Sequence, residues 1–405
     1  MADHEVITAQ QHQISTLMSR SGARGLTVAV RADPGPEVLA RWDAMVAATP
    51  QADVTQLSVW ARLRGTAGYT PLYVLVWRGA DLVAGAQILH RRFPLLGTVG
   101  YLPYGPVITP TDEARQDVCR ELSVALAQVA RRRLRMLFVQ PPDCAADVSS
   151  ELLWRGFRPS AAEVAPSGSL RIDLAADEAE LRRGLTKRLQ TWTRRWQARG
   201  VTVRRGNEHD LELLIDLIAC SASHQGYEPL SGDYLRALYR MLAPTGHAVL
   251  FIGELHGAPV ATELYTACGG MLRLRLRGLD RSGEAARLSV PAAITWEAMC
   301  WAKAEGFRWF DFGGLRTPTL RALLDGDAES GEQLRVDRFK TSFGGAPYRY
   351  PVPVEVICSP FLRATYDLSR RWPAGRQLVD RATRLARGTI RPRDVIRMLR
   401  TRSRE

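Results

Sequence analysis

Apolar and polar positions in the first half of the chain follow two different periods, and these predict a mixed α/β unit. Short apolar runs at 72–77 and 134–139 are typical of buried strands, and 82–89 and 98–102 are further strand candidates. Apolar residues at 112–133 recur every three to four positions, which predicts a helix. The expected order is therefore strand, strand, strand, helix, strand.

The second half of the chain repeats this order of elements. Strands are expected at 248–254, 260–266, 271–277 and 307–312. A helix is expected at 290–305, ended by Gly306. Side-chain identity between the halves is weak, yet two copies of one α/β unit explain the repeated order better than a single large sheet.

The repeat and the length of 405 residues predict two domains with extensions. We expect a flexible leader at 1–24, a first domain at 25–175 and a second at 176–345. A strand and a helix at 346–372 are expected to return to the first domain, and 373–405 form a basic C-terminal tail.

A basic segment between the two halves, 178–199, is expected to form one helix. It carries Lys187, and it places Trp192 and Trp196 four residues apart, hence on one helical face. Two interpretations stay open. The segment is either an arm that faces phosphates and stacks bases, or a packed amphipathic helix whose basic side is solvated.

The charge balance favours an anionic partner. The formal net charge is +13, which suits nucleic acid, an anionic lipid surface or a phosphorylated substrate, although a basic surface without a dedicated partner is the alternative. Arginine supplies almost all of the positive charge. Only three of the 55 basic residues are lysines, whose compact ammonium differs from the planar guanidinium: Lys187, Lys303 and Lys340.

Several classes of protein do not fit the sequence. The six cysteines are scattered without the spacing of zinc sites or disulfide frameworks, so we expect free thiols in a reducing compartment and no metal. The N-terminal residues lack an apolar signal segment, and no apolar run approaches 18 residues. A cytoplasmic protein without a transmembrane segment is the expectation.

Four short motifs together resemble one known family. They are residues 56–61 (QLSVWA) followed by Arg64, then 101–106 (YLPYGP), 310–314 (FDFGG) and 338–345 (RFKTSFGG). In this order and spacing they resemble the FemABX peptidyltransferases. The motifs are similar to that family's Q-x-S-x-W, Y-x-P-x-G-P, D-F-G-G and F-K-x-x-F-G stretches.

The resemblance spans about residues 50–360. It implies a fold of two tandem GNAT-like (acetyltransferase-like) domains, in agreement with the repeat. It also implies an aminoacyltransferase that uses aminoacyl-tRNA, without a cofactor, to form a peptide bond on an amine of a peptidoglycan precursor. The basic tail adds an expectation of peripheral contact with a membrane surface.

Lys340 is the expected catalytic residue. Attack of an amine on an aminoacyl ester forms a tetrahedral oxyanion, and a preorganised cation at that oxygen lowers the barrier most. The resemblance implies this role for Lys340, with Phe339 beside the terminal adenosine of the RNA. Lys187, on the basic segment, is a further candidate for binding the acceptor end of the tRNA. The alternatives are a surface ammonium for Lys340 and a core aromatic for Phe339. Gly344 and Gly345 would permit close approach of a ligand.

Asp311, Gly313 and Gly314 are possible supporting residues. Asp311 could assist proton transfer, but capping of the glycine turn is the simpler reading. A general base need not be a side chain, because the ribose oxygen can collect the proton through the adjacent hydroxyl or water.

The acceptor pocket is expected in the first domain. Arg64 would pair with phosphate, and tyrosine hydroxyls would lie over an apolar floor. Burial as ordinary core aromatics is the alternative for some of these side chains. The full candidate set is Trp60, Arg64, Tyr101, Tyr104, His224 and Tyr227.

The chain departs from the family pattern at two basic positions. Arg64 stands where the family usually has lysine, and His224 lies near a position where relatives carry arginine. There is also no room after Gly200 for the long helical hairpin of some members. An acceptor other than a peptidoglycan precursor, such as a natural-product intermediate, is therefore also open.

Two rival functions follow from the same residues. An acyl-CoA-dependent GNAT N-acyltransferase would need an R/Q-x-x-G-x-G/A loop at a helix N-terminus, and residues 278–286 lack that pattern and add two acids. A non-catalytic protein that binds RNA or a membrane surface through its arginines is the second rival.

Overall fold

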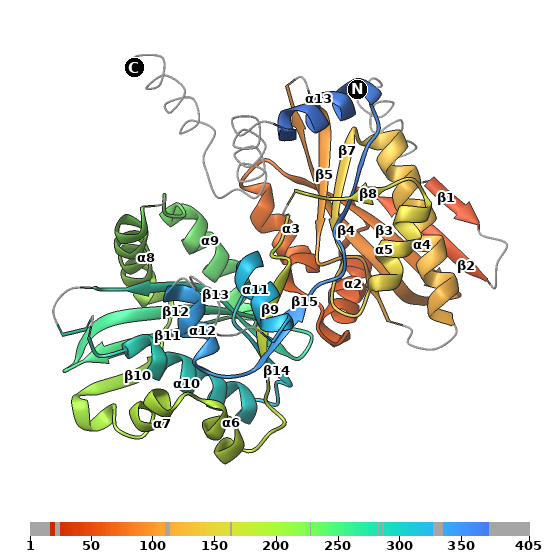
Figure 1. Ribbon diagram of the computed structural model, residues 1–405. Helices are drawn as coiled ribbons and strands as arrows, with labels where there is room; N and C mark the ends of the chain where they lie inside the picture. Colours follow the sequence, from red (N-terminus) through yellow and green to blue (C-terminus); the bar gives the residue numbers. More distant parts are fainter. Residues whose placement is uncertain are drawn as a thin grey trace, which may run out of the picture. The chain divides into compact units, whose positions relative to one another are not determined.

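The computed structural model describes residues 17–20, 25–94, 96–109, 114–162, 164–226, 228–281, 284–285, 287–326 and 335–371. The chain divides into two compact units (Figure 1). Among the described residues, unit 1 comprises those up to Ala165 together with those from Tyr350 onward, and unit 2 comprises those from Pro166 to Arg349.

Unit 1 is built on one mixed sheet. The strand order is β1 (Leu17–Arg20), β2 (Leu26–Arg31), β3 (Thr70–Arg78), β4 (Asp81–Phe93), β5 (Gly97–Pro103), β7 (Met136–Gln140), β16 (Val354–Ile357) and β8 (Arg158–Pro159), and β6 (Val107–Ile108) pairs with β4. β5 and β7 are parallel, and the other pairs are antiparallel. The helices of this unit are α2 (Pro36–Ala48), α3 (Ser58–Gly65), α4 (Ala114–Arg133), α5 (Ala146–Trp154) and α13 (Pro360–Arg371).

Helices cover both faces of this sheet, which explains the continuous apolar run in β3. Val74 and Val76 pack with Leu122 of α4 in one core cluster. Tyr73 points to the other face, where its ring lies edge-on to Trp42 of α2, with 6.2 Å between ring centres. Successive strand residues point to opposite faces, so a strand buried on both sides is apolar throughout.

Unit 2 is built on a second mixed sheet. Its order is β10 (Val201–Arg205), β11 (Ala248–Leu255), β12 (Ala258–Cys268), β13 (Met271–Leu279), β14 (Trp309–Asp311), β9 (Gly168–Asp173) and β15 (Ala346–Arg349). β13 and β14 are parallel, and the other pairs are antiparallel. The helices are α6 (Glu178–Gly184), α7 (Lys187–Trp192), α8 (Leu211–Gln225), α9 (Gly232–Leu242), α10 (Val290–Ala304), α11 (Thr317–Leu324) and α12 (Arg335–Thr341).

The two sheets share one topology, as the sequence repeat predicts. Each has an antiparallel run followed by one parallel pair and then two more antiparallel strands. In each sheet the next-to-last strand is far along the chain from its neighbours in the sheet. β9 precedes all other strands of unit 2, and β16 of unit 1 lies after all of unit 2 in the chain. The predicted mixed α/β architecture with two mixed sheets is confirmed.

The boundaries of the two units along the chain differ by a few residues from the sequence expectation. Along the chain, the boundaries between the units fall at Ala165/Pro166 and Arg349/Tyr350, whereas the sequence analysis expects them at 175/176 and 345/346. β9 pairs with β14 and β15, so it belongs to unit 2. Of the expected leader 1–24, residues 17–20 form β1 against β2, and the rest lies outside the described residues, as does the tail 373–405.

The prediction of a single helix at 178–199 is wrong. The segment forms α6, α7 and a short 3₁₀ turn at Gln197–Arg199. The helix stops after Gly184 because Leu185 is extended and buried and the Thr186 N–H donates to the Ser342 carbonyl at 2.9 Å. Trp196 is buried in the core of unit 2, which supports the packed interpretation of the segment.

Three further observations concern the described residues alone. No helix there is long and apolar enough to cross a membrane. No group of three or more potential metal ligands occurs there. The six cysteines are all free thiols.

Candidate active site

Lys340 lies near the end of α12, and its ammonium is enclosed by the protein. The side chain is 8% exposed, and Nζ donates to the carbonyl of Gly314. Burial, reinforced by the nearby Arg277 cation, lowers the pKa of Lys340 to about 8. Asp337 and Asp311 act in the opposite direction and favour the charged form. The ammonium is thus a fixed cation with two further N–H donors.

Phe339 contacts both an arginine and the aromatic core of unit 2. The Arg277 guanidinium lies 3.9 Å from the centre of its ring, a cation–π contact. Phe339 also contacts Phe343, whose ring centre is 5.2 Å away, and the ring centres of Phe343 and Phe312 are 5.4 Å apart. Phe339 is half-buried, so it is anchored in the core without being wholly enclosed.

Arg277 is held by a buried carboxylate that the sequence analysis did not single out. Arg277 Nε lies 2.5 Å from Oε1 of Glu263, a fully buried residue of β12. Thr295 donates to the same carboxylate, and so does the Tyr265 hydroxyl. Burial raises the pKa of Glu263, although Arg277 partly offsets this effect. One signal was available: Glu263 is an acid within the apolar strand 258–268.

Asp311 organises the turn that presents the Gly314 carbonyl to Lys340. Its carboxylate accepts from Ser169 Oγ at 2.6 Å, from Arg171 Nε at 3.1 Å and from the Gly313 N–H at 2.7 Å. Burial alone would raise the pKa of Asp311, but the cations of Arg273 and Arg171 hold it below its usual value. The capping interpretation of Asp311 fits these contacts.

Gly313 and Gly314 are required by the turn itself. Gly313 has a φ of +73°, and a Cβ there would lie 2.2 Å from the carbonyl oxygen of Leu274. Gly314 has a φ of +89° and is equally unsuited to a side chain. Its N–H donates to Ser169 Oγ at 3.1 Å, so the turn is fixed at both ends.

The second glycine pair packs against the chain and not against a ligand. A Cβ on Gly344 would lie 2.5 Å from the carbonyl oxygen of Gly184, and one on Gly345 would lie 2.5 Å from that of Arg171. The close backbone approach expected at these glycines is therefore made by the protein itself. It fixes the loop after α12 to the end of α6 and to β9.

Lys187 is exposed at the first residue of α7. Its neighbour Thr186 bonds to Ser342, two residues beyond Lys340. Lys187 is thereby joined through the backbone to the loop that follows the candidate catalytic lysine. A basic groove of about 450 Å³ lies on the same α6–α7 segment and is lined by Glu178, Ala179, Arg182, Arg183, Gln190 and Arg194.

The first two motifs meet inside unit 1 through buried hydrogen bonds. Thr55 Oγ1 and Gln56 Nε2 both donate to the Pro103 carbonyl at 2.9 Å. Gln56 Oε1 accepts from the Gln87 N–H at 2.9 Å, and Tyr73 donates to the Gln87 side chain at 2.8 Å. The glutamine of the first motif therefore positions the tyrosine–proline segment of the second.

Arg64 is enclosed by tyrosines. It is 1% exposed, its Nε donates to the Tyr101 hydroxyl at 2.9 Å, and its guanidinium lies 4.8 Å from the ring centre of Tyr69. Contact with a substrate phosphate would require this cluster to open. Trp60 and Tyr104 are also buried, so the expected acceptor side chains of unit 1 are at present core-like.

The other acceptor candidates are not part of that cluster. His224 is exposed in the last turn of α8, in unit 2. Tyr227 lies outside the described residues. The structure thus brings together Lys340, Phe339, Asp311, Gly313 and Gly314 in unit 2, and it groups Trp60, Arg64, Tyr101 and Tyr104 in unit 1.

The N-terminus of α10 is where an acyl-CoA enzyme would bind pyrophosphate through backbone N–H groups. Here the second helical residue is Pro291, which has no N–H. The carbonyl of Ser289 accepts from Trp192 Nε1 at 3.1 Å, and Glu284 lies in the preceding loop, 3.7 Å from His256. Within the described residues, these features do not favour a bound pyrophosphate.

Comparison with known proteins supports the GNAT-like fold. The family model described as acetyltransferase (GNAT) domain matches residues 155–329. The lipid II:glycine glycyltransferase of Staphylococcus saprophyticus is 26% identical over 234 residues, which cover 55% of this chain and 56% of that protein. The protein of that name from Staphylococcus aureus is 23% identical over 225 residues, covering 53% of each. The chain thus spans about half the length of the curated relatives it matches.

A solved structure titled FemX shares the fold. It is 17% identical, has a TM-score of 0.70, and the match covers 80% of this chain and 98% of that one. The predicted fold of two tandem GNAT-like domains with mixed sheets is therefore confirmed. The chain is thus similar in sequence to lipid II:glycine glycyltransferases and in fold to FemX, as the ordered motifs lead one to expect.

Proposed function

We propose that this protein transfers an aminoacyl group from aminoacyl-tRNA to an amine, forming a peptide bond in the cytoplasm. The acceptor is a peptidoglycan precursor or a natural-product intermediate. The relatives whose names specify transfer of glycine to lipid II support the reaction class and the first of these acceptors. The observation that carries the proposal is the enclosed Lys340 ammonium beside Phe339 in unit 2.

Lys340 is proposed to stabilise the oxyanion. The acceptor nitrogen attacks the ester carbonyl carbon, and the carbonyl electrons move to oxygen. Collapse of this intermediate breaks the bond to the ribose oxygen, which collects the proton lost by the amine through the adjacent hydroxyl or water. The Gly314 carbonyl fixes Nζ by one hydrogen bond and leaves two N–H donors for the oxyanion. A cation in such a site is typically worth about 3–4 kcal/mol.

The terminal adenosine of the RNA is proposed to stack near Phe339. Arg277 lies over that ring and supplies a second cation close to Lys340, held in place by Glu263. Lys187 and the arginines of the α6–α7 groove, Arg182, Arg183 and Arg194, are proposed to contact phosphates of the acceptor stem. If several phosphates are contacted, binding should weaken steeply as salt is raised.

Acceptor binding is proposed for unit 1. Arg64 and Tyr101 form a buried guanidinium–hydroxyl pair, which could reach a phosphate only after local opening. His224 and Tyr227 remain acceptor candidates in this proposal. The identity of the acceptor amine is tested by comparing the rate of transfer to each candidate.

The test is transfer of a labelled amino acid. The full chain is incubated with labelled aminoacyl-tRNA and candidate amines, before and after RNase treatment of the donor. We expect product only with intact RNA. Transfer that persists after RNase treatment, or that requires acyl-CoA, would refute the proposal.

An acyl-CoA-dependent N-acyltransferase is the second candidate, because a GNAT family model matches residues 155–329. Pro291 at the start of α10 argues against it. Binding of CoA and acetyl-CoA by calorimetry separates the two candidates. Micromolar binding of either compound would favour the acyl-CoA enzyme. The remaining alternative is a non-catalytic protein that binds RNA or a membrane surface. In that case, cells that carry a Lys340 variant should keep the protein's activity.

A further inference from the structure

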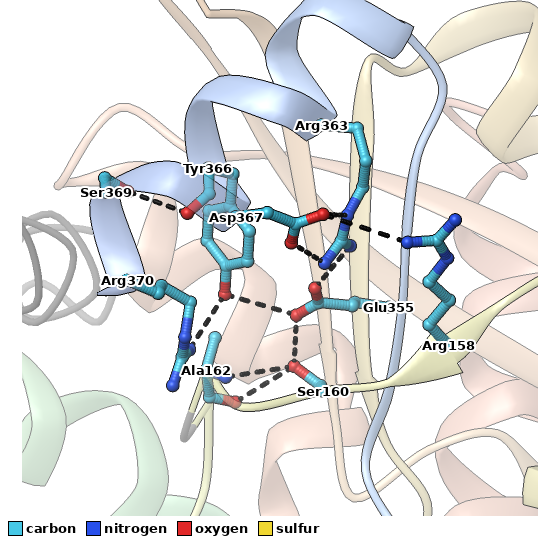
Figure 2. Close-up of polar contacts among 9 residues, drawn as sticks. All are labelled: Arg158, Ser160, Ala162, Glu355, Arg363, Tyr366, Asp367, Ser369 and Arg370. Atoms are coloured by element: carbon cyan, nitrogen blue, oxygen red, sulfur yellow. Dashed lines mark hydrogen bonds and ion pairs between the residues drawn. The ribbon is translucent and has the colours of Figure 1, made fainter. Parts of the chain in front are cut away.

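Helix α13 of unit 1 is attached to the sheet through a buried polar cluster (Figure 2). Glu355 of β16 is 1% exposed and accepts from Ser160 Oγ at 2.6 Å and from Arg363 Nη1 at 2.7 Å. The Tyr366 hydroxyl also donates to Glu355, at 3.3 Å, and Arg370 bonds to that hydroxyl at 3.2 Å. The side chains of Arg363, Tyr366 and Arg370 on α13 are therefore held against the protein by this cluster.

Two residues of the inward face add apolar contact. Leu362 and Tyr366 pack against a small core cluster that includes Met136 and Phe138. The ring centre of Tyr366 lies 6.3 Å from that of Phe138. Together with the polar cluster, this packing fixes the rotation of α13 about its own axis.

The outward face of α13 exposes two large apolar side chains. Phe361 is 77% exposed and Leu368 is 49% exposed, seven residues apart on the same side. Ala364 and Thr365 lie between them and are exposed as well. Surface helices normally bury their apolar stripe and turn charged residues outward. On α13, by contrast, Phe361 and Leu368 are exposed to solvent while Arg363 is held against the sheet.

Basic side chains border the same face. A groove of about 710 Å³ is lined by the start of α13, including Phe361, and by the β4–β5 hairpin. Arg92 and Arg135 are exposed in it, beside the exposed Leu96. Gly97 leaves room for the Arg135 side chain, since a Cβ at that position would lie 2.7 Å from Arg135 Cγ.

We propose that this surface, called here the α13 face, docks unit 1 on a bilayer that contains anionic phospholipid. The α13 face consists of Phe361, Ala364, Leu368, Leu96, Arg92 and Arg135. Apolar side chains enter the boundary between headgroups and acyl chains, as in interfacial helices, and the arginines pair with lipid phosphates. The proposal is independent of the proposed function, because it requires no catalysis.

Charge complementarity selects this occupant over the others. The chain carries a net charge of +13, and the sequence after α13, residues 372–405, contains ten arginines and only three acids. RNA would use the arginines but gains little from exposed Leu96 and Leu368. A second copy of the chain would need roughly 800 Å² of complementary surface per partner, well beyond one side of a twelve-residue helix.

Vesicle flotation tests the proposal on the full-length chain. Vesicles of phosphatidylcholine alone are compared with vesicles of phosphatidylcholine and phosphatidylglycerol in a 3:1 ratio. We expect binding only to the anionic vesicles, and at least a tenfold weaker partition for the Phe361→Ser/Leu368→Ser double variant. Because both side chains are exposed, the variant should keep its fold and its melting temperature.

The matched control is Trp154→Ser, which removes an exposed aromatic side chain of unit 1 outside α13 and should bind as well as the parent. A Phe361→Trp variant adds a direct readout, since its emission should shift to the blue on anionic vesicles. Absence of binding to anionic vesicles, or equal loss with Trp154→Ser, overturns the proposal. So does a double variant that loses RNA binding or self-association while vesicle binding persists.

Discussion

At the scale of single residues, the proposed mechanism depends on the Lys340 ammonium, which stays charged although its burial disfavours the charged form. Lys340 is enclosed and lies near Arg277, and both features lower its pKa to about 8. Asp337 and Asp311 limit that shift. Asp337 is itself buried and accepts from Thr319 Oγ1 at 2.7 Å, which ties α12 to α11. The chain therefore retains a cation that remains mostly protonated at neutral pH.

The rate of transfer should fall as pH rises through about 8. The oxyanion donor is the protonated form of Lys340, so its contribution is present below that pKa and lost above it. The rising limb at lower pH belongs to the acceptor amine, which must be neutral to attack. Single-turnover rates from pH 6 to 10 test this, and amines of different pKa should move only the rising limb. A rate that stays flat above pH 8.5 with every amine contradicts the assignment.

Removal of the Glu263 carboxylate should destabilise unit 2. Glu263→Ala leaves Arg277 and the Tyr265 hydroxyl without their shared partner, which typically costs about 3–5 kcal/mol for a buried pair. The matched control is Glu254→Ala in the neighbouring strand, because Glu254 pairs with the more exposed Arg204 and should cost about 1 kcal/mol or less. Urea unfolding measures both free energies. Equal losses would show that the buried pair has no special role.

At the scale of secondary structure, the loop after α12 depends on close contact between backbones. Gly344 combines a φ of +77° with the approach of the Gly184 carbonyl. Gly344→Ala should therefore cost more than the roughly 1–2 kcal/mol of a left-handed residue alone, and it should also slow transfer because α12 must shift. Gly246→Ala is the control, since φ is +75° and nothing lies within 4 Å of the new Cβ. Similar unfolding free energies for the two variants would contradict this view of the loop.

Hydrophobic periodicity predicted the strands of the first sheet because helices cover both of its faces. The run at 72–77 is apolar throughout for that reason, and it became β3. The prediction of one helix at 178–199 failed because helical spacing of apolar residues continues past Gly184. The chain leaves the helix there, and the next residues form a backbone hydrogen bond to Ser342. Periodicity within a segment carries no information about such distant hydrogen bonds.

The candidate site was only partly predictable. Lys340 and Phe339 stand in a motif, whereas Arg277 is one arginine among many, and nothing local marks it as the residue over Phe339. Arg64 was assigned to phosphate from its motif position. Its enclosure by Tyr69 and Tyr101 depends on residues that come together only in the fold.

At the scale of the whole molecule, the position of β16 late in the chain makes the two units unequal. All seven strands of the second sheet lie between Pro166 and Arg349, in one continuous stretch. The first sheet needs β16, which pairs with both β7 and β8 and lies at 354–357. Each unit has its own core cluster, in keeping with separate folding.

Fragments should reveal this difference. Residues 166–349 should unfold cooperatively in urea as an isolated fragment. Residues 25–165 should not, because strand β16, which lies between β7 and β8, and the carboxylate of Glu355 are missing. Addition of a peptide of residues 350–371 should restore structure to the second fragment, as followed by circular dichroism. Cooperative folding of 25–165 without that peptide would contradict the role given to β16.

Single-turnover transfer by a Lys340→Met variant tests the central claim most directly. Methionine fills similar space without charge, so the fold and the affinity for aminoacyl-tRNA should be kept. The transfer rate should drop by roughly 10²–10³-fold, and Lys340→Arg should recover little of it because a guanidinium cannot reproduce a compact ammonium. A methionine variant that binds aminoacyl-tRNA normally and transfers within threefold of the parent rate would contradict the account.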